Sequence, residues 1–170
     1  MPFKNLEDVL KIDPRFVGIC TMRDGLPVQM ELADLHAWIA EVQLGSSALV
    51  DVQTAFDRVR SMLLYAYFDY DLLVPAEIQA FGAVEPALKH RLNGHGQPSK
   101  ETLRNVVDRA PKAGILSPLS SKDRPLSDPI EAMIALRNGL SHGTADLHLP
   151  AMAVNVIEAC AGVIGTIYPG

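Results

Sequence analysis

Cysteine is scarce in this chain, and the motifs of several large enzyme classes are absent. Cys20 and Cys160 are the two cysteines in 170 residues, and they lie far apart without metal-ligand spacing. We therefore expect reduced structural thiols, no disulfide framework and no metal site. No Gly-rich phosphate loop, nucleophile elbow or zinc-protease spacing occurs either. These absences disfavour the enzyme classes that use such motifs, and we expect no cofactor.

A secretion signal and a clear membrane span are also missing. The N-terminus has no charged segment followed by an apolar one, which predicts a cytoplasmic protein. The longest late apolar run, Ala151 to Tyr168, contains Asn155, Glu158 and several small residues. Such a composition favours a buried or interface helix over a membrane span, so we expect no membrane partner.

Positive charge is in short supply overall but is unevenly distributed. The net charge of −5 disfavours a nucleic-acid partner at first sight. Residues 1–85 contain 6 Lys and Arg against 13 Asp and Glu, whereas residues 86–170 contain 9 against 7. The basic half can form a local positive surface, for which the candidates are Lys89, Arg91, Lys100, Arg104, Arg109 and Lys112. We select Lys89, Arg91 and Arg104 as candidate RNA-binding residues, the alternative being ordinary solvated charges on helix faces.

Apolar residues recur at three- and four-residue spacing through most of the chain, which predicts an all-α protein. The first 30 residues differ, because 16–22 alternates weakly like a strand and Asp24-Gly25 is typical of a hairpin turn. We expect a small N-terminal extension over 1–45, either irregular or a β-hairpin and followed by a short helix, and a helical bundle over 46–170. The predicted helices cover 31–43, 48–70, 75–92, 99–111, 128–142 and 151–168.

The helix over 128–142 has a well-marked start and one residue out of place. Asp128 can cap it, Pro129 suits its first position, and Glu131 completes a capping box. Arg137 falls within an apolar stripe that begins at Ile130. Burying its charge costs several kcal/mol unless a partner compensates. We therefore expect Arg137 to have a counter-charge, a phosphate ligand or an open edge.

His142 ends the same helix. It lies five residues after Arg137, about 140° away around a regular helix, so the two cannot converge within one helix. Asn138 is four residues before His142, and its amide can bond and orient the imidazole ring. Gly143 offers a left-handed C-terminal cap, which places His142 where the helix dipole favours imidazolium. A histidine in this position can donate a proton.

The segment Arg137-Asn138-Gly139-Leu140-Ser141-His142 resembles the motif of the HEPN family (higher eukaryotes and prokaryotes nucleotide-binding), in which Arg precedes His by a short spacer that begins with a polar residue. The resemblance covers about Ser46 to Tyr168 and implies a HEPN-like antiparallel helical bundle. Many HEPN domains carry a glutamate in an upstream helix, and the segment VEPALKHRL around Glu85 is similar to that element.

Glu85 also falls within an apolar stripe, on the helix over 75–92. Two opposite charges in core stripes of one chain suggest that Glu85 faces Arg137, which fixes the arginine and leaves donors for a phosphate. Pro86 departs from the family pattern and is expected to kink this helix.

The resemblance implies a metal-independent endoribonuclease that cleaves single-stranded RNA through its 2′-hydroxyl, at a composite site in a homodimer. Arg137 would bind the scissile phosphate, His142 would act as general acid or base, and Asn138 would position either, with Glu85 and Ser141 in support.

Two alternatives stay open. One is a non-catalytic module that binds nucleic acid, a nucleotide or a protein, such as an antitoxin or a regulatory partner in a defence or toxin–antitoxin system. The other is that Arg137 and His142 only cap and pair within a bundle. A metal site at His142, Asp146 and His148 is disfavoured, because no further ligand lies nearby in sequence.

Overall fold

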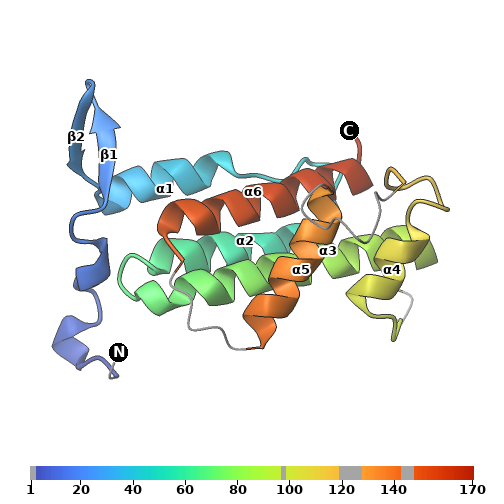
Figure 1. Ribbon diagram of the computed structural model, residues 1–170, viewed down its shortest axis with the longest axis horizontal. Coiled ribbons are helices and arrows are strands. Elements are labelled where there is room, and N and C mark those ends of the chain that lie inside the picture. Colours follow the sequence, from blue (N-terminus) through green and yellow to red (C-terminus); the bar gives the residue numbers. More distant parts are fainter. Residues whose placement is uncertain (1–2, 97–98, 119–127, 143–147) are drawn as a thin grey trace.

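The computed structural model describes residues 3–96, 99–118, 128–142 and 148–170, which form six α-helices and one β-hairpin (Figure 1). The coarse prediction of an all-α bundle with a small N-terminal hairpin is confirmed. The helices are α1 (Leu32–Glu41), α2 (Val50–Tyr65), α3 (Leu73–Asn93), α4 (Leu103–Arg109), α5 (Pro129–Ser141) and α6 (Pro150–Ile167). The strands are β1 (Cys20–Arg23) and β2 (Leu26–Gln29), and short 3₁₀ turns cover Leu6–Asp8, Pro14–Phe16 and Tyr70–Leu72.

The hairpin projects from one end of the bundle (Figure 1). Its strands are antiparallel, with Cys20 opposite Gln29. Asp24 and Gly25 join them with positive φ angles of 53° and 78°, the conformation that a two-residue hairpin turn with Asp-Gly requires. The strand begins later than predicted, because Phe16 belongs to a 3₁₀ turn and is fully buried. The extension thereby contributes an aromatic residue to the same core as the helices.

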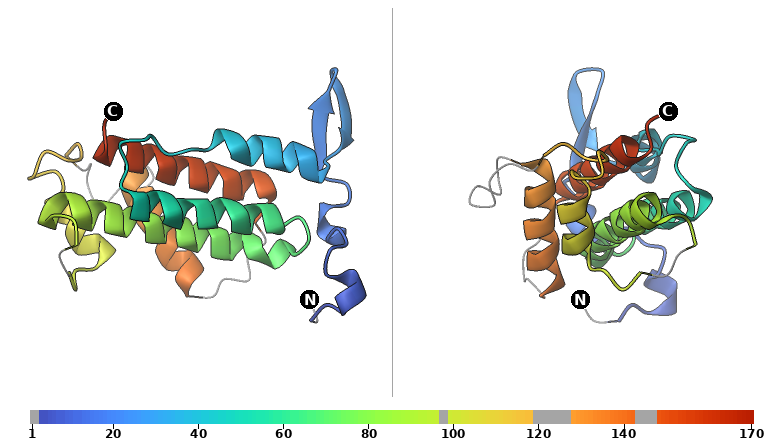
Figure 2. Two further views of the ribbon diagram at one scale, coloured as in Figure 1. Left: turned by 180° about the vertical axis from the view of Figure 1, so that it is seen from behind. Right: turned by 90° about the vertical axis from the view of Figure 1, so that its right-hand side faces the viewer.

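α3 is the central helix of the bundle. It packs against α2 and α6 along its length and also contacts α4 and α5 (Figures 1 and 2). Its buried residues include four alanines, which let neighbouring helices approach closely: Ala76, Ala80, Ala83 and Ala87. Larger buried side chains such as Phe81 each contribute about 1.5–3 kcal/mol through removal from water. α3 continues through Pro86 to Asn93, so the proline does not end the helix.

The aromatic end of α2 is a packing element. The helix was predicted to reach Tyr70 but ends at Tyr65, because Asp69 caps the following 3₁₀ turn through the backbone N–H of Asp71. The Phe16 ring contacts those of Tyr67 and Tyr70, with centroids 5.3 Å apart in both pairs. These rings therefore join the N-terminal extension to the bundle.

α6 is the one described helix whose length and composition would suffice to cross a membrane. Its inner face is nevertheless packed into the bundle, and its buried residues include Ala153, Val154, Ile157, Cys160, Ile164 and Ile167. Tyr168, just beyond the helix, bonds through its hydroxyl to the backbone carbonyl of Ala87 on α3. The apolar composition of α6 is thus accounted for by its place beside α3 and α2.

Candidate functional site

The helix α5, which carries the Arg137–His142 motif, has the predicted N-terminal cap at Asp128. The predicted capping box with Glu131 is not formed. One carboxylate oxygen of Asp128 accepts from the backbone N–H of Ile130 at 2.9 Å and from that of Glu131 at 3.3 Å, and Pro129 occupies the first position. The Glu131 side chain is buried and binds Arg104 instead of returning to the helix start. The predicted capping box is wrong because a cation on α4 is a stronger partner for this carboxylate than a backbone N–H.

A cleft of about 510 Å³ lies between α3, the start of α4 and α5. It brings together five of the site residues predicted from the sequence, which are Glu85, Lys89, Arg104, Arg137 and Asn138. The rest of its lining consists of Lys100, Glu101, Thr102, Leu103 and Ile134. Three of the predicted residues do not line it: Arg91, Ser141 and His142. This cleft is the candidate functional site.

Arg137 lines the cleft and is half-buried. Its guanidinium donates to the Asn138 side-chain oxygen at 3.3 Å, and within the described part of the chain it forms no ion pair. The predicted pairing with Glu85 is therefore wrong. Glu85 binds Lys89 at 2.7 Å, because the lysine lies one turn away on the same helix face. Arg137 remains available to an external anion.

Two of the predicted RNA-binding cations are already neutralised. Lys89 is held by Glu85, and Arg104 is bound by Asp108 on its own helix and by Glu131 on α5. The hydrogen bonds with Asp108, and then those with Glu131, raise the pKa of Arg104 above its ordinary value. These side chains shape the wall of the cleft but offer little free charge to a ligand.

Lys100 is the cleft cation that sequence reasoning did not select. It is exposed, lines the cleft just before α4, and forms no ion pair with the described residues. It had been named among the basic residues of the C-terminal half, but no local signal separates it from Lys89 or Arg104. Arg137 and Lys100 thus provide two uncompensated positive charges, one from α5 and one from the segment before α4.

His142 lies at the C-terminal end of α5 and is exposed. Its imidazole has no hydrogen-bond partner among the described residues, and Asn138 accepts from Arg137 rather than bonding the ring. Ser141 is exposed as well. The predicted cap Gly143 lies outside the described residues. Arg137 and His142 of one chain therefore do not line a common cleft.

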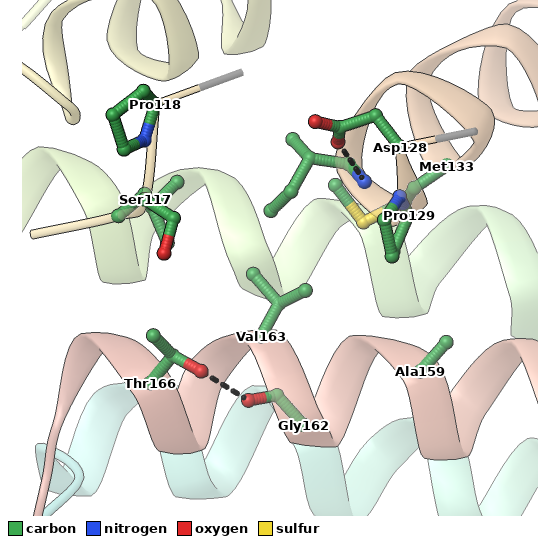
Figure 3. A pocket seen from close by; sticks show the side chains of 11 residues that line it. Ser117, Pro118, Asp128, Pro129, Met133, Ala159, Gly162, Val163 and Thr166 are labelled. Atoms are coloured by element: carbon green, nitrogen blue, oxygen red, sulfur yellow. Dashed lines mark hydrogen bonds between the residues drawn. The ribbon is translucent and has the colours of Figure 1, made fainter. Parts of the chain in front are cut away.

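A second groove lies between the start of α5 and the outer face of α6 and encloses about 380 Å³ (Figure 3). It is lined mainly by apolar and small side chains, among them Met133, Ala159 and Val163. Its one carboxylate, that of Asp128, caps α5 by accepting from the backbone N–H of Ile130. A dashed line at Asp128 marks this bond in Figure 3. The hydroxyls in its lining belong to Ser117 and to Thr166, which donates to the backbone carbonyl of Gly162, and Asp128 is the one charged residue among those that line it.

The described residues contain no group of three or more His, Cys, Asp or Glu side chains arranged to hold a metal ion. His148 is buried and bonded to Glu77 instead of pointing toward His142. Asp146, the third residue of the disfavoured metal site, lies outside the described residues.

No family model, curated protein or solved structure gives a significant match to this chain. The resemblance to HEPN domains consequently rests on the Arg137–His142 segment, the glutamate of the upstream helix and the helical pattern.

Proposed function

We propose that this protein binds RNA in the cleft between α3, α4 and α5 and cleaves it, as a metal-independent endoribonuclease of the HEPN type. The observation that carries the proposal is the half-buried Arg137, whose guanidinium has no carboxylate partner among the described residues. An arginine kept unpaired at the wall of a cleft is suited to a phosphate, because its planar donors match two phosphate oxygens. Lys100 adds a second cation to the same cleft.

The chemistry requires three contributions at one phosphodiester: activation of the 2′-hydroxyl, stabilisation of negative charge, and protonation of the leaving 5′-oxygen. Arg137 stabilises the negative charge, because its guanidinium lies where the phosphate would bind. His142 is suited to one of the proton transfers, since imidazole can exchange protons near neutral pH. Asn138 bonds Arg137 and so orients the guanidinium rather than the imidazole.

His142 does not line the cleft of its own chain, so one copy lacks a complete site. The proposal therefore includes a homodimer in which His142 of one copy reaches the phosphate held by Arg137 of the other. A two-fold axis would form two such sites, each with groups from both chains.

A second candidate is a non-catalytic module that binds RNA, a nucleotide or a partner protein through the same cleft. The separation of Arg137 from His142 favours it, because binding a phosphate needs Arg137 and Lys100 but no imidazole. A protein partner such as an antitoxin and a cytoplasmic location remain predictions under either candidate.

The two candidates differ in what happens to single-stranded RNA incubated with purified protein in excess chelator. The ribonuclease proposal predicts cleavage that is lost in Arg137→Ala and in His142→Ala. Lys112→Ala serves as a control, because this exposed lysine does not line the cleft. Cleavage that persists in the double variant contradicts the proposal. RNA that binds without being cut supports the second candidate.

Mixing the two inactive variants tests the composite site. An equal mixture forms heterodimers in about half of all dimers, and each has one intact site, so about one quarter of the original activity should return. No recovery, in a mixture shown to exchange subunits, would place both groups in a single chain.

A further inference from the structure

A carboxylate and an imidazole meet in the interior of the bundle, and neither belongs to the residues that line the cleft. Glu77 on α3 is fully buried, and His148, two residues before α6, is almost as well covered. Glu77 Oε1 lies 2.8 Å from His148 Nδ1, within hydrogen-bond distance. The two residues are 71 positions apart in sequence, so the contact fixes the tertiary arrangement rather than a local turn.

The other carboxylate oxygen of Glu77 makes the pair unusual. Oε2 is buried and has no hydrogen-bond partner among the described residues. A buried oxygen without a donor disfavours the full negative charge. Burial accordingly raises the pKa of Glu77, and the hydrogen bond with His148 offsets part of that effect.

In the part of the chain that the structure describes, no further charged group interacts with Glu77 in a way that could compensate a change in the pair. Among the described residues, Cys160 on α6 is the other titratable group that interacts with Glu77. Burial, together with the charge of Glu77, raises the pKa of the Cys160 thiol to about 12, so this neighbour stays neutral. When Glu77 is ionised and His148 is protonated, or when Glu77 is protonated and His148 is neutral, the pair has no net charge. One further proton leaves a buried positive charge, and loss of a proton leaves a buried negative charge.

His148 holds a defined place in the chain. α6 begins two residues after it, at Pro150. We propose that Glu77 and His148 form a proton-sharing latch that fixes the start of α6 to α3 and holds most tightly when the pair has no net charge. The latch does not depend on the ribonuclease proposal, because neither residue lines the cleft.

Hydrogen–deuterium exchange at the first backbone amides of α6, residues 151–156, tests the latch across pH in the full chain. After correction for intrinsic exchange, the wild-type protein should show greatest protection at intermediate pH and faster exchange on both the acid and the alkaline side. Glu77→Gln should lose the alkaline acceleration, because no carboxylate remains to give up the shared proton. His148→Gln should lose the acid acceleration, because no imidazole remains to take up a further proton.

Glu158→Gln is the matched control, because it makes the same chemical change at an exposed position of α6. It should exchange like wild type at every pH. A pH response that is unchanged in Glu77→Gln, or equally altered in Glu158→Gln, would overturn the proposal.

A measurement on the wild-type protein covers the case in which a variant fails to fold. In ¹⁵N-histidine-labelled protein, the ring signals of His148 should change over the same acid and alkaline ranges in which the first amides of α6 lose protection. Ring signals that stay constant while protection is lost would refute the latch.

Discussion

One guanidinium nitrogen of Arg104 donates to both carboxylate oxygens of Glu131, at 3.0 and 2.8 Å, and so joins α4 to α5. Glu131 is 7% exposed, so its charge depends on this partner. Arg104 thereby holds together two walls of the cleft that contains Arg137. A residue selected from the sequence for its charge turns out to be part of the framework of the site.

Arg104→Ala should lower the free energy of unfolding by about 3 kcal/mol, because it leaves the buried Glu131 carboxylate without a partner. Urea unfolding measures the change, with the exposed Lys112→Ala as control. In the double variant Arg104→Ala/Glu131→Gln the loss should be smaller than the sum of the single losses. Additive losses would mean that the two side chains are not coupled.

Lys100→Ala should weaken binding of single-stranded RNA and lower the slope of log affinity against log salt by about 1, because one phosphate contact is lost. Lys89→Ala should change the slope less, since Glu85 already neutralises this lysine. Fluorescence anisotropy at several salt concentrations separates the two variants. Equal slopes for both would argue against Lys100 as a phosphate ligand.

Asp13 should make stability depend on pH in the acid range. Burial alone would raise its pKa, but hydrogen bonds from Arg15 and from the backbone N–H of Tyr70 outweigh burial and lower the pKa to about 2, against an ordinary value of 3.8. Because the folded-state pKa is the lower one, this stabilisation is present above pH 4 and is lost as the pH falls toward 2.

The loss attributable to Asp13 should amount to about 2 kcal/mol, as a shift of nearly two pKa units implies. Urea unfolding at pH 5 and pH 2.5 should show a smaller acid loss for Asp13→Asn than for wild type. Asp24→Asn is a suitable control, because Asp24 is exposed and Asn tolerates its positive φ. An acid loss in Asp13→Asn equal to that of wild type would contradict the assignment.

Asp128→Ala should cost about 1 kcal/mol of stability, because it removes the acceptor for two backbone N–H groups at the start of α5. Asp128→Ser, which keeps a side-chain oxygen at this position, should restore most of the loss. Thermal unfolding of the three proteins provides the comparison. A serine variant no more stable than the alanine variant would show that the cap contributes little.

Local patterns predicted much of this fold correctly. The Asp128 cap, the Asp24-Gly25 turn and the amphipathic helices all depend on residues within a few positions of one another, and the structure contains each of them. Each feature depends on the residues of a single turn or a single helix face, and the spacing of these residues can be recognised in the sequence.

The partners of charged side chains were not predictable in the same way. Glu131 had a local role available at the helix start but binds Arg104, which is 27 residues away. Glu85 had an attractive distant partner in Arg137 but binds Lys89 on its own helix. Sequence spacing shows which side chains can meet within one helix. Which of several possible partners a charged side chain binds depends on how the helices pack against one another.

The two cysteines differ in a way that makes the protein convenient to label. Cys20 is exposed on β1, whereas Cys160 is buried in α6 with its pKa raised to about 12 by burial and by Glu77. A maleimide dye at neutral pH will consequently attach to the hairpin of the folded protein and leave the helix core unmodified. Reaction of the second thiol then marks molecules whose C-terminal helix has come away from its neighbours, and a mass spectrum can count them.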